Sequence, residues 1–161
     1  TALFYTAQRS ITIVNPYFVP DSDLMTAITS AARRGIAVTM VNSEIIDQFF
    51  VGHAQRSYYE ELLDAGVHIY LHRSPALVHS KFIIIDDEVS TVGSSNMDIR
   101  SFLLDSELTV VVYGAQFASS LQAVADTYLA NSKMIDKEIW STRPVAHKIF
   151  DTIARLTASI Q

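Results

Sequence analysis

Two kinds of hydrophobic spacing alternate along the chain. Short runs rich in β-branched and aliphatic residues predict strands at residues 10–18, 36–42, 67–71, 82–85 and 106–114. Apolar residues at helical spacing predict helices at 21–35, 53–66, 115–132 and 143–160. Strands and helices that alternate in this way predict an α/β sandwich, in which helices flank a mixed, mostly parallel sheet that carries an inserted antiparallel hairpin.

The last predicted helix has a regular apolar stripe. Ile149, Ile153, Leu156 and Ile160 recur at spacings of three and four residues, so they share one helix face. We expect this face to pack into the core; contact with a membrane surface is the alternative.

Composition restricts the classes of protein that the chain can belong to. The 161 residues are 49% hydrophobic, which is enough for one domain, residues 1–161, around a single core. The net charge of −5 argues against nucleic acid as the main partner. No cysteine is present, so disulfides and thiolate metal sites are excluded.

Three histidines suggest a metal site at first reading. His68 and His72 are four residues apart, but they fall in a predicted strand, where that spacing gives no paired ligands. We interpret them, together with His53, as ordinary surface or core residues, and we expect neither a metal nor another cofactor.

The predicted hairpin places its polar residues at one end. His79 and Lys81 precede an apolar strand and, being two residues apart, point to the same face. Asp86 lies seven residues beyond His79, about 23 Å along an extended strand, and has the opposite parity. We therefore expect Asp86 to hydrogen-bond backbone near the turn rather than to orient His79.

A hairpin register suggests which polar side chains meet. If Asp87 and Glu88 form a two-residue loop, Lys81 faces Ser94 and His79 faces Asn96. Histidine, lysine, serine and asparagine together supply a proton carrier, a positive charge and neutral donors, which is the equipment needed to hold and attack a phosphate. His79 also needs a partner that fixes its tautomer, and Glu107 in the next strand is the candidate.

These residues form a known pattern. H-x-K-x4-D at His79, Lys81 and Asp86, followed by G-S-x-N at 93–96 and by Glu107, resembles the phospholipase D superfamily. The resemblance implies an α-β-α sandwich with one HKD motif. It narrows to the second half of bacterial cardiolipin synthases, because NPYFVPD, RSYYEELLDAGVHIYL and SSNMDIRSFLLDSEL look like that family across nearly the whole chain.

The resemblance implies a reaction and a role for each residue. Such enzymes join two phosphatidylglycerol molecules into cardiolipin and glycerol through a phosphohistidine, without a metal. His79 would be the acid and base, and Glu107 would orient it. Lys81, Ser94 and Asn96 would bind phosphate. Arg100 and Ser101 follow the motif and would contact the headgroup or brace the pocket.

The chain departs from the family in two respects. The first HKD half and any membrane anchor are absent, so we expect a fragment of a longer, two-domain, membrane-anchored enzyme, inactive alone. Where many relatives have Leu-Pro after the second strand, this chain has Asn42-Ser43, a difference that we expect to affect only a loop.

Partners and location follow from the same resemblance. We expect a phospholipid substrate, the missing half or a second copy of the chain, and a membrane surface. The native enzyme would lie at the bacterial cell membrane, held by parts absent from this soluble fragment. Two alternatives stay open: a homodimeric single-motif phosphodiesterase or nuclease, and an inactive half that only binds phosphate or membrane.

Overall fold

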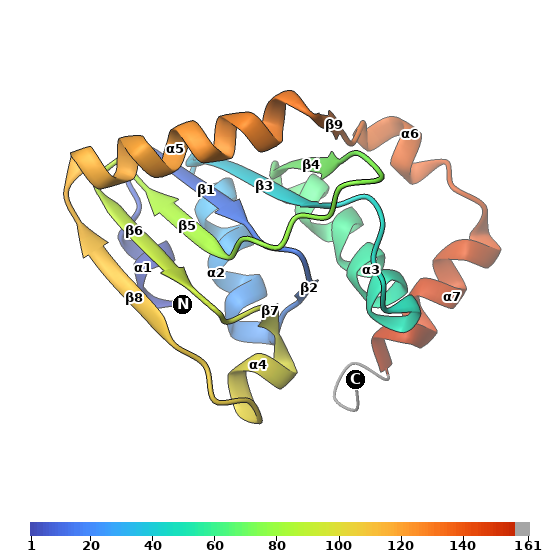
Figure 1. The fold of residues 1–161 in the computed structure, drawn as a ribbon. Helices are drawn as coiled ribbons and strands as arrows, with labels where there is room; N and C mark the ends of the chain where they lie inside the picture. The colour runs from blue at the N-terminus through green and yellow to red at the C-terminus, as the bar shows by residue number, and fades with distance from the viewer. Residues whose placement is uncertain (157–161) are drawn as a thin grey trace.

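The computed structural model describes residues 1–156, with Leu103 described by its backbone alone. The elements at the N-terminal end of the chain are α1 (Ala2–Thr6), β1 (Ser10–Val14), β2 (Phe18–Val19), α2 (Ser22–Arg33), β3 (Ala37–Ser43), α3 (Phe49–Ala65) and β4 (His68–His72). They are followed by β5 (Phe82–Ile85), β6 (Val89–Gly93), β7 (Met97–Asp98), α4 (Ile99–Leu103), β8 (Thr109–Tyr113), α5 (Ala115–Ala130), β9 (Ser132–Met134), α6 (Lys137–Ser141) and α7 (Val145–Leu156). The predicted α/β sandwich is confirmed (Figure 1).

The seven-stranded sheet has a parallel centre. Its order is β8-β6-β5-β1-β3-β4-β9, in which β1, β3 and β4 are parallel. The outer strands pair antiparallel, so β8 and β9 extend the antiparallel part beyond the predicted hairpin. As a result, the carboxyl ends of β1 and β3 meet the start of β5, the end of β6 and the start of β8. We call this edge of the sheet the site edge.

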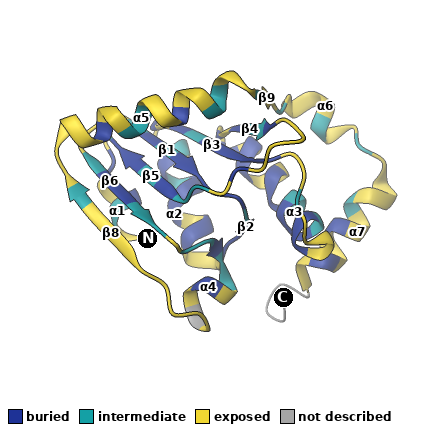
Figure 2. Cartoon of the chain, viewed as in Figure 1, coloured by how far each residue is buried: buried dark blue, intermediate teal, exposed yellow. Residues whose placement is uncertain are grey.

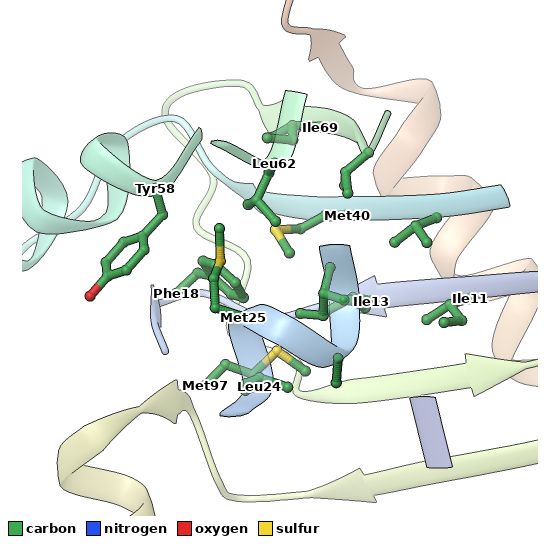
Figure 3. Packing of buried hydrophobic residues seen from close by; sticks show 14 of the residues in the cluster. Ile11, Ile13, Phe18, Leu24, Met25, Met40, Tyr58, Leu62, Ile69 and Met97 are labelled. Atoms are coloured by element: carbon green, nitrogen blue, oxygen red, sulfur yellow. The ribbon is translucent and has the colours of Figure 1, made fainter. Parts of the chain in front are cut away.

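Helices cover both faces of the sheet. In Figure 1, α5 lies across one face, while α2 and α3 lie on the other. Side chains alternate accordingly: Ile11 and Ile13 of β1 join the larger apolar cluster with α2 and α3, whereas Phe82 and Ile84 of β5 join the cluster beneath α5. Figure 3 shows the larger cluster, in which residues from β1, α2, β3 and α3 interdigitate.

Local signals at helix ends behave as the sequence predicts. The Asp21 side chain caps α2 by accepting a hydrogen bond from the Leu24 amide at 2.8 Å. Gly35 and Gly66 end α2 and α3 with φ of 88° and 98°, which glycine adopts without a Cβ penalty. The start of α3 differs, since the helix begins at Phe49 rather than at the predicted His53.

The predicted register of the hairpin is wrong by one residue. The turn contains three residues, Asp86, Asp87 and Glu88, rather than two; Asp86 and Asp87 have positive φ (54° and 58°), and the Glu88 amide donates to the Ile85 carbonyl at 3.0 Å. Ile85 therefore pairs with Val89, and Gly93 donates a backbone hydrogen bond to the Lys81 carbonyl at 3.1 Å. Lys81 consequently does not face Ser94, and His79 does not face Asn96.

The apolar stripe of the last helix points away from the core, contrary to expectation. Ile149, Ile153 and Leu156 are 56%, 54% and 78% exposed, while the buried residues of α7 are Asp151 and Ala154 (Figure 2). Ile160 lies outside the described residues. Within residues 1–156, no helix combines the length and apolar character needed to cross a membrane.

Candidate active site at the edge of the sheet

Backbone pairing brings three polar segments together at the site edge. The His79–Lys81 segment runs directly into β5, Ser94–Asn96 follows β6, and Glu107 lies two residues before β8. The Ser94 amide donates to the Leu108 carbonyl at 3.0 Å, which extends the β6–β8 pairing to this point. The site is thus assembled where strands end and side chains are free to turn toward a ligand.

Lys81 is partly buried among acidic neighbours. Its Nζ donates to the His79 carbonyl oxygen at 3.0 Å, which links the two residues of the motif. Burial lowers the pKa of Lys81, and the carboxylates of Glu107 and Asp98 oppose that shift without cancelling it. A bound phosphate would add negative charge here and favour the protonated amine.

Glu107 has different partners from those expected. It accepts a short hydrogen bond from Ser94 Oγ and a longer one, 3.5 Å, from Ser101 Oγ. The Ser94 hydroxyl also accepts a hydrogen bond from the Leu108 amide at 3.1 Å, so Ser94 connects the Glu107 carboxylate to the backbone just before β8. In the described part of the chain no hydrogen bond joins Glu107 to His79, whose side chain is exposed.

Asn96 lies between two cavities. The larger, about 560 Å³, is mostly apolar and is lined by both Lys81 and Asn96. The smaller, about 340 Å³, is polar and is lined by Asn96, Arg100 and Ser101 among others. Asn96 Oδ1 is buried without a hydrogen-bond partner among the described residues. A buried amide oxygen without a partner is uncommon, and only a hydrogen-bond donor could satisfy it. His79 lines neither cavity.

Asp86 lies at the opposite end of the hairpin, as the distance argument predicts. Its carboxylate accepts three backbone hydrogen bonds from Gln8, Arg9 and Ser10, at 2.8, 2.7 and 2.9 Å. Burial raises the pKa of Asp86, but these three donors and the Arg9 charge outweigh burial and hold the pKa below its usual range. Asp86 therefore ties the hairpin turn to the start of β1.

The smaller cavity is lined by Tyr17, a residue that sequence reasoning did not assign to the site. Tyr17 donates from its hydroxyl to Asp47 Oδ1 at 2.5 Å. Burial raises the pKa of Tyr17 to about 12, helped by this bond and by the negative charges of Asp47 and Asp98. Arg100 and Asp105, which also line this cavity, form an ion pair at 3.4 Å. The motif NPYFVPD was the available signal for Tyr17.

Asn42 and Ser43 are not loop residues, contrary to expectation. They end β3, and they are 0% and 3% exposed. Ser43 Oγ accepts the Val78 amide at 2.9 Å, and the Asn42 amide nitrogen donates to the Asn15 carbonyl at 2.8 Å. Buried polar side chains need such partners, so this pair is part of the structure behind the site.

The remaining histidines are dispersed. His53 Nδ1 lies 2.7 Å from buried Asp151, which also pairs with Arg143. His72 packs edge-on against Tyr128, and His68 is exposed. Among residues 1–156, no group of three or more His, Cys, Asp or Glu side chains is arranged to hold a metal ion.

Comparison with known proteins identifies the family. The family model for the cardiolipin synthase, phospholipase D-like domain matches residues 1–129. The chain belongs to this family. It is 40% identical to cardiolipin synthase A of Klebsiella pneumoniae over 149 residues, and 38% identical to that of Yersinia pseudotuberculosis. In both cases the match covers 92% of this chain but only 30% of the relative's length.

Solved structures show the same fold. The chain resembles the phospholipase D family member Nuc from Salmonella typhimurium, with a TM-score of 0.73 and 22% identity, over 83% of this chain and 86% of that one. It also resembles phosphatidylserine synthase from Haemophilus influenzae, with a TM-score of 0.74 and 16% identity, over 99% of this chain and 43% of that one. The α-β-α sandwich is therefore the phospholipase D fold, and the site edge of this cardiolipin synthase-like domain carries its H-x-K and G-S-x-N segments.

Proposed function

We propose that the chain is the second catalytic half of a cardiolipin synthase-like phosphatidyltransferase, which converts two phosphatidylglycerol molecules into cardiolipin and glycerol. The observation that carries the proposal is that Lys81 and Asn96 line one cavity, beside His79, in a chain of this family. An ammonium and an amide at one cavity are suited to the non-bridging oxygens of a phosphodiester.

The proposed chemistry proceeds by two displacements. A histidine from the other HKD motif attacks phosphorus, the bond from phosphorus to the glycerol oxygen breaks, and His79 gives that oxygen a proton. His79 then removes the proton of the incoming hydroxyl, whose oxygen attacks phosphorus and releases the first histidine. Covalent catalysis of this kind divides one difficult transfer into two easier steps. Lys81 and Asn96 stabilise the charge on the phosphoryl oxygens in both.

The charges at the site edge support the proposal that this chain contributes half of a catalytic site (a half-site) rather than a complete one. Lys81 is flanked by the carboxylates of Glu107 and Asp98, and the Arg100 guanidinium is already paired with Asp105. Transfer of an anionic phosphodiester needs more positive charge in the transition state than this arrangement offers. A second H-x-K motif would supply another lysine and the nucleophilic histidine, and the 30% share of the relatives' length leaves room for it.

Two further parts of the proposal concern Glu107 and location. With a phosphate bound, Glu107 is proposed to orient His79, with the serines Ser94 and Ser101 holding the carboxylate in the meantime. Arg100 and Ser101, on the smaller cavity, are proposed to contact the glycerol headgroup. The complete enzyme is proposed to work at the bacterial cell membrane, attached through parts outside this chain.

The deciding experiment measures turnover of phosphatidylglycerol by the purified chain while its mass in solution is determined. We expect no appreciable turnover, because one of two proton-handling groups is missing and each contributes about 10²-fold or more. The same assay on the full two-motif enzyme should be active and should lose at least about 10²-fold with His79→Ala. His68→Ala, at an exposed position on β4, is the matched control and should retain activity.

Two outcomes would contradict the half-site. Turnover by a monomer would refute it outright. Turnover by a dimer, abolished by His79→Ala, would instead favour a homodimeric single-motif phosphodiesterase. The fold permits this second candidate, since Nuc, a chain of the same fold, is matched over 86% of its own length.

A further inference from the structure

A single buried hydroxyl fastens the chain immediately before His79. Ser43 Oγ accepts a hydrogen bond from the Val78 amide at 2.9 Å and also lies 3.4 Å from the Val78 carbonyl, to which it can donate. Both residues are buried, at 3% and 1% exposure. Residues 73–81 contain no helix or strand, and residues 73–77 are exposed. Backbone–backbone hydrogen bonds hold the segment at Arg73 and at Lys81, but none is formed by the described residues 74–80, where the Ser43 side chain holds the backbone instead.

Asn42, the residue before Ser43, anchors the segment around Asn96. Asn42 Nδ2 donates to the Asn15 carbonyl at 2.8 Å, and Tyr59 donates to Asn42 Oδ1 at 3.3 Å. The Asn15 side chain in turn accepts the Met97 amide at 3.2 Å and donates to the Ser95 carbonyl at 3.4 Å. Asn15 thus holds the chain on both sides of Asn96, and Asn42 holds Asn15.

We propose that Asn42 and Ser43 are positioning residues that set the distance between the His79–Lys81 segment and the Asn96 segment. The inference rests on the proposed function, since it concerns the same phosphate site. The two side chains are neighbours at the end of β3, so a rigid strand connects their two anchoring points. Catalytic groups must be held within a fraction of an ångström, and supporting hydrogen bonds achieve this.

Both anchoring bonds need a side chain that can donate or accept a hydrogen bond, as asparagine and serine can. In this chain, the loss of the Ser43 hydroxyl would leave the buried Val78 amide without a partner. Asn42 and Ser43 thus act through Asn15 and Val78, without touching a ligand themselves.

The test compares local amide exchange with phosphate affinity in the full chain, both by NMR. Ser43→Val and Ser43→Thr form a matched pair of similar shape that differ in the hydroxyl. We expect Ser43→Val to speed exchange of the Val78 amide by about tenfold or more and Ser43→Thr to restore protection. Asn42→Leu should instead speed exchange of the Met97 amide, which the Asn15 side chain holds. Affinity for inorganic phosphate should fall at least about fivefold in Ser43→Val and Asn42→Leu and recover in Ser43→Thr.

Ser90 provides the control for burial alone. It is 1% exposed in β6, and its Oγ has no hydrogen-bond partner among the described residues, so Ser90→Ala should change neither exchange nor affinity. Urea unfolding of every variant separates local from global loss of stability. Three results would each overturn the inference: amide exchange that accelerates equally in both segments, amide exchange that does not accelerate, or failure of Ser43→Thr to restore protection.

The two proposals fail separately. If the unchanged chain does not bind inorganic phosphate while exchange responds as expected, the proposed phosphate site is wrong and the anchoring role stands. If the unchanged chain binds phosphate and the Ser43 variants bind it equally well, the positioning role is wrong and the proposed function stands.

Discussion

Replacing Asp86 with asparagine should destabilise the fold without affecting the phosphate site. The carboxylate accepts backbone hydrogen bonds from Gln8 on one oxygen and from Arg9 and Ser10 on the other. Asparagine keeps one acceptor oxygen and tolerates the positive φ of this position, but it loses the second acceptor and the charge. Asp86→Asn therefore isolates the anchoring of the turn.

The size of the effect follows from these contacts. A hydrogen bond to a charged group contributes about 1.5–3 kcal/mol, and the partial exposure of the Asp86 bonds places them at the low end of that range. One bond lost and two weakened give a loss of about 2 kcal/mol. With a urea m-value of about 2 kcal/mol/M, the unfolding midpoint should fall by about 1 M. Asp86→Ala, which loses all three bonds, should cost more.

Asp87→Asn is the matched control, because Asp87 has the same left-handed conformation. Within residues 1–156 its carboxylate pairs only with Arg9, at 3.9 Å, and both side chains are largely exposed. The free energy of unfolding should therefore change by less than about 0.5 kcal/mol in Asp87→Asn. An unchanged midpoint in Asp86→Asn, accompanied by lost phosphate affinity, would refute the reasoning and return Asp86 to the site.

The pH dependence of stability provides a second test of the role of the Asp86 carboxylate. Its pKa is lower in the folded chain than the ordinary value of 3.8, so the contribution is complete above that value and is lost as pH falls through the folded pKa. The free energy of unfolding should therefore fall less between neutral and acid pH in Asp86→Asn than in the unchanged chain. Equal acid sensitivity in both would contradict the assigned hydrogen bonds.

Two more predictions concern the site edge. Gly93→Ala should destabilise the fold by at least about 2 kcal/mol in urea unfolding, because its Cβ would lie 2.2 Å from the Leu108 carbonyl oxygen, whereas Gly52→Ala meets only a side chain at 3.3 Å and should cost much less. Inorganic phosphate binding, followed by calorimetry, should fall at least about tenfold in Lys81→Met. Phosphate binding by the unchanged chain should weaken as the pH rises, and it should do so at a lower pH than the ordinary lysine pKa of 10.5, because the pKa of Lys81 is lowered and binding needs the protonated amine. Binding that persists above pH 10.5 would contradict the assignment.

Much of the fold could be predicted because local signals and tertiary structure agree. Asp21 caps α2, Gly35 and Gly66 end helices with positive φ, and the apolar positions of α2 and α3 are buried as their period indicates. Each of these signals depends on a few neighbouring residues, so the sequence contains all the information that is needed.

The hairpin register could not be predicted, because a distant contact selects the turn. Asp86 and Asp87 adopt positive φ, which glycine or asparagine would have signalled, and the Asp86 carboxylate is held by amides more than 70 positions away. The error had limited consequences for the site. β5 begins after Lys81 and β6 ends before Ser94, so strand parity does not govern where their side chains point.

The orientation of α7 shows a second limit of pattern reading. The period correctly predicts a helix with one apolar face, but it does not determine which face packs inward. Here Asp151 is buried, because His53 lies 2.7 Å and Arg143 lies 2.9 Å from its carboxylate oxygens. A buried charge with two partners fixes the helix rotation, and the aliphatic stripe then faces outward.

The candidate site residues were found by motif, and their internal contacts alone would not have revealed them. In the structure Lys81 donates to a carbonyl, and Ser94 donates to Glu107, so each polar group uses the nearest partner in the chain. Asn96 is the exception, since its buried Oδ1 has no partner among the described residues, a cost of about 1–3 kcal/mol. The nitrogen and oxygen of an amide exchange places by a half-turn of the side chain, so the same group can present an N–H to an anion. This unsatisfied amide, rather than the bonds already made, is the feature that distinguishes Asn96 within the site.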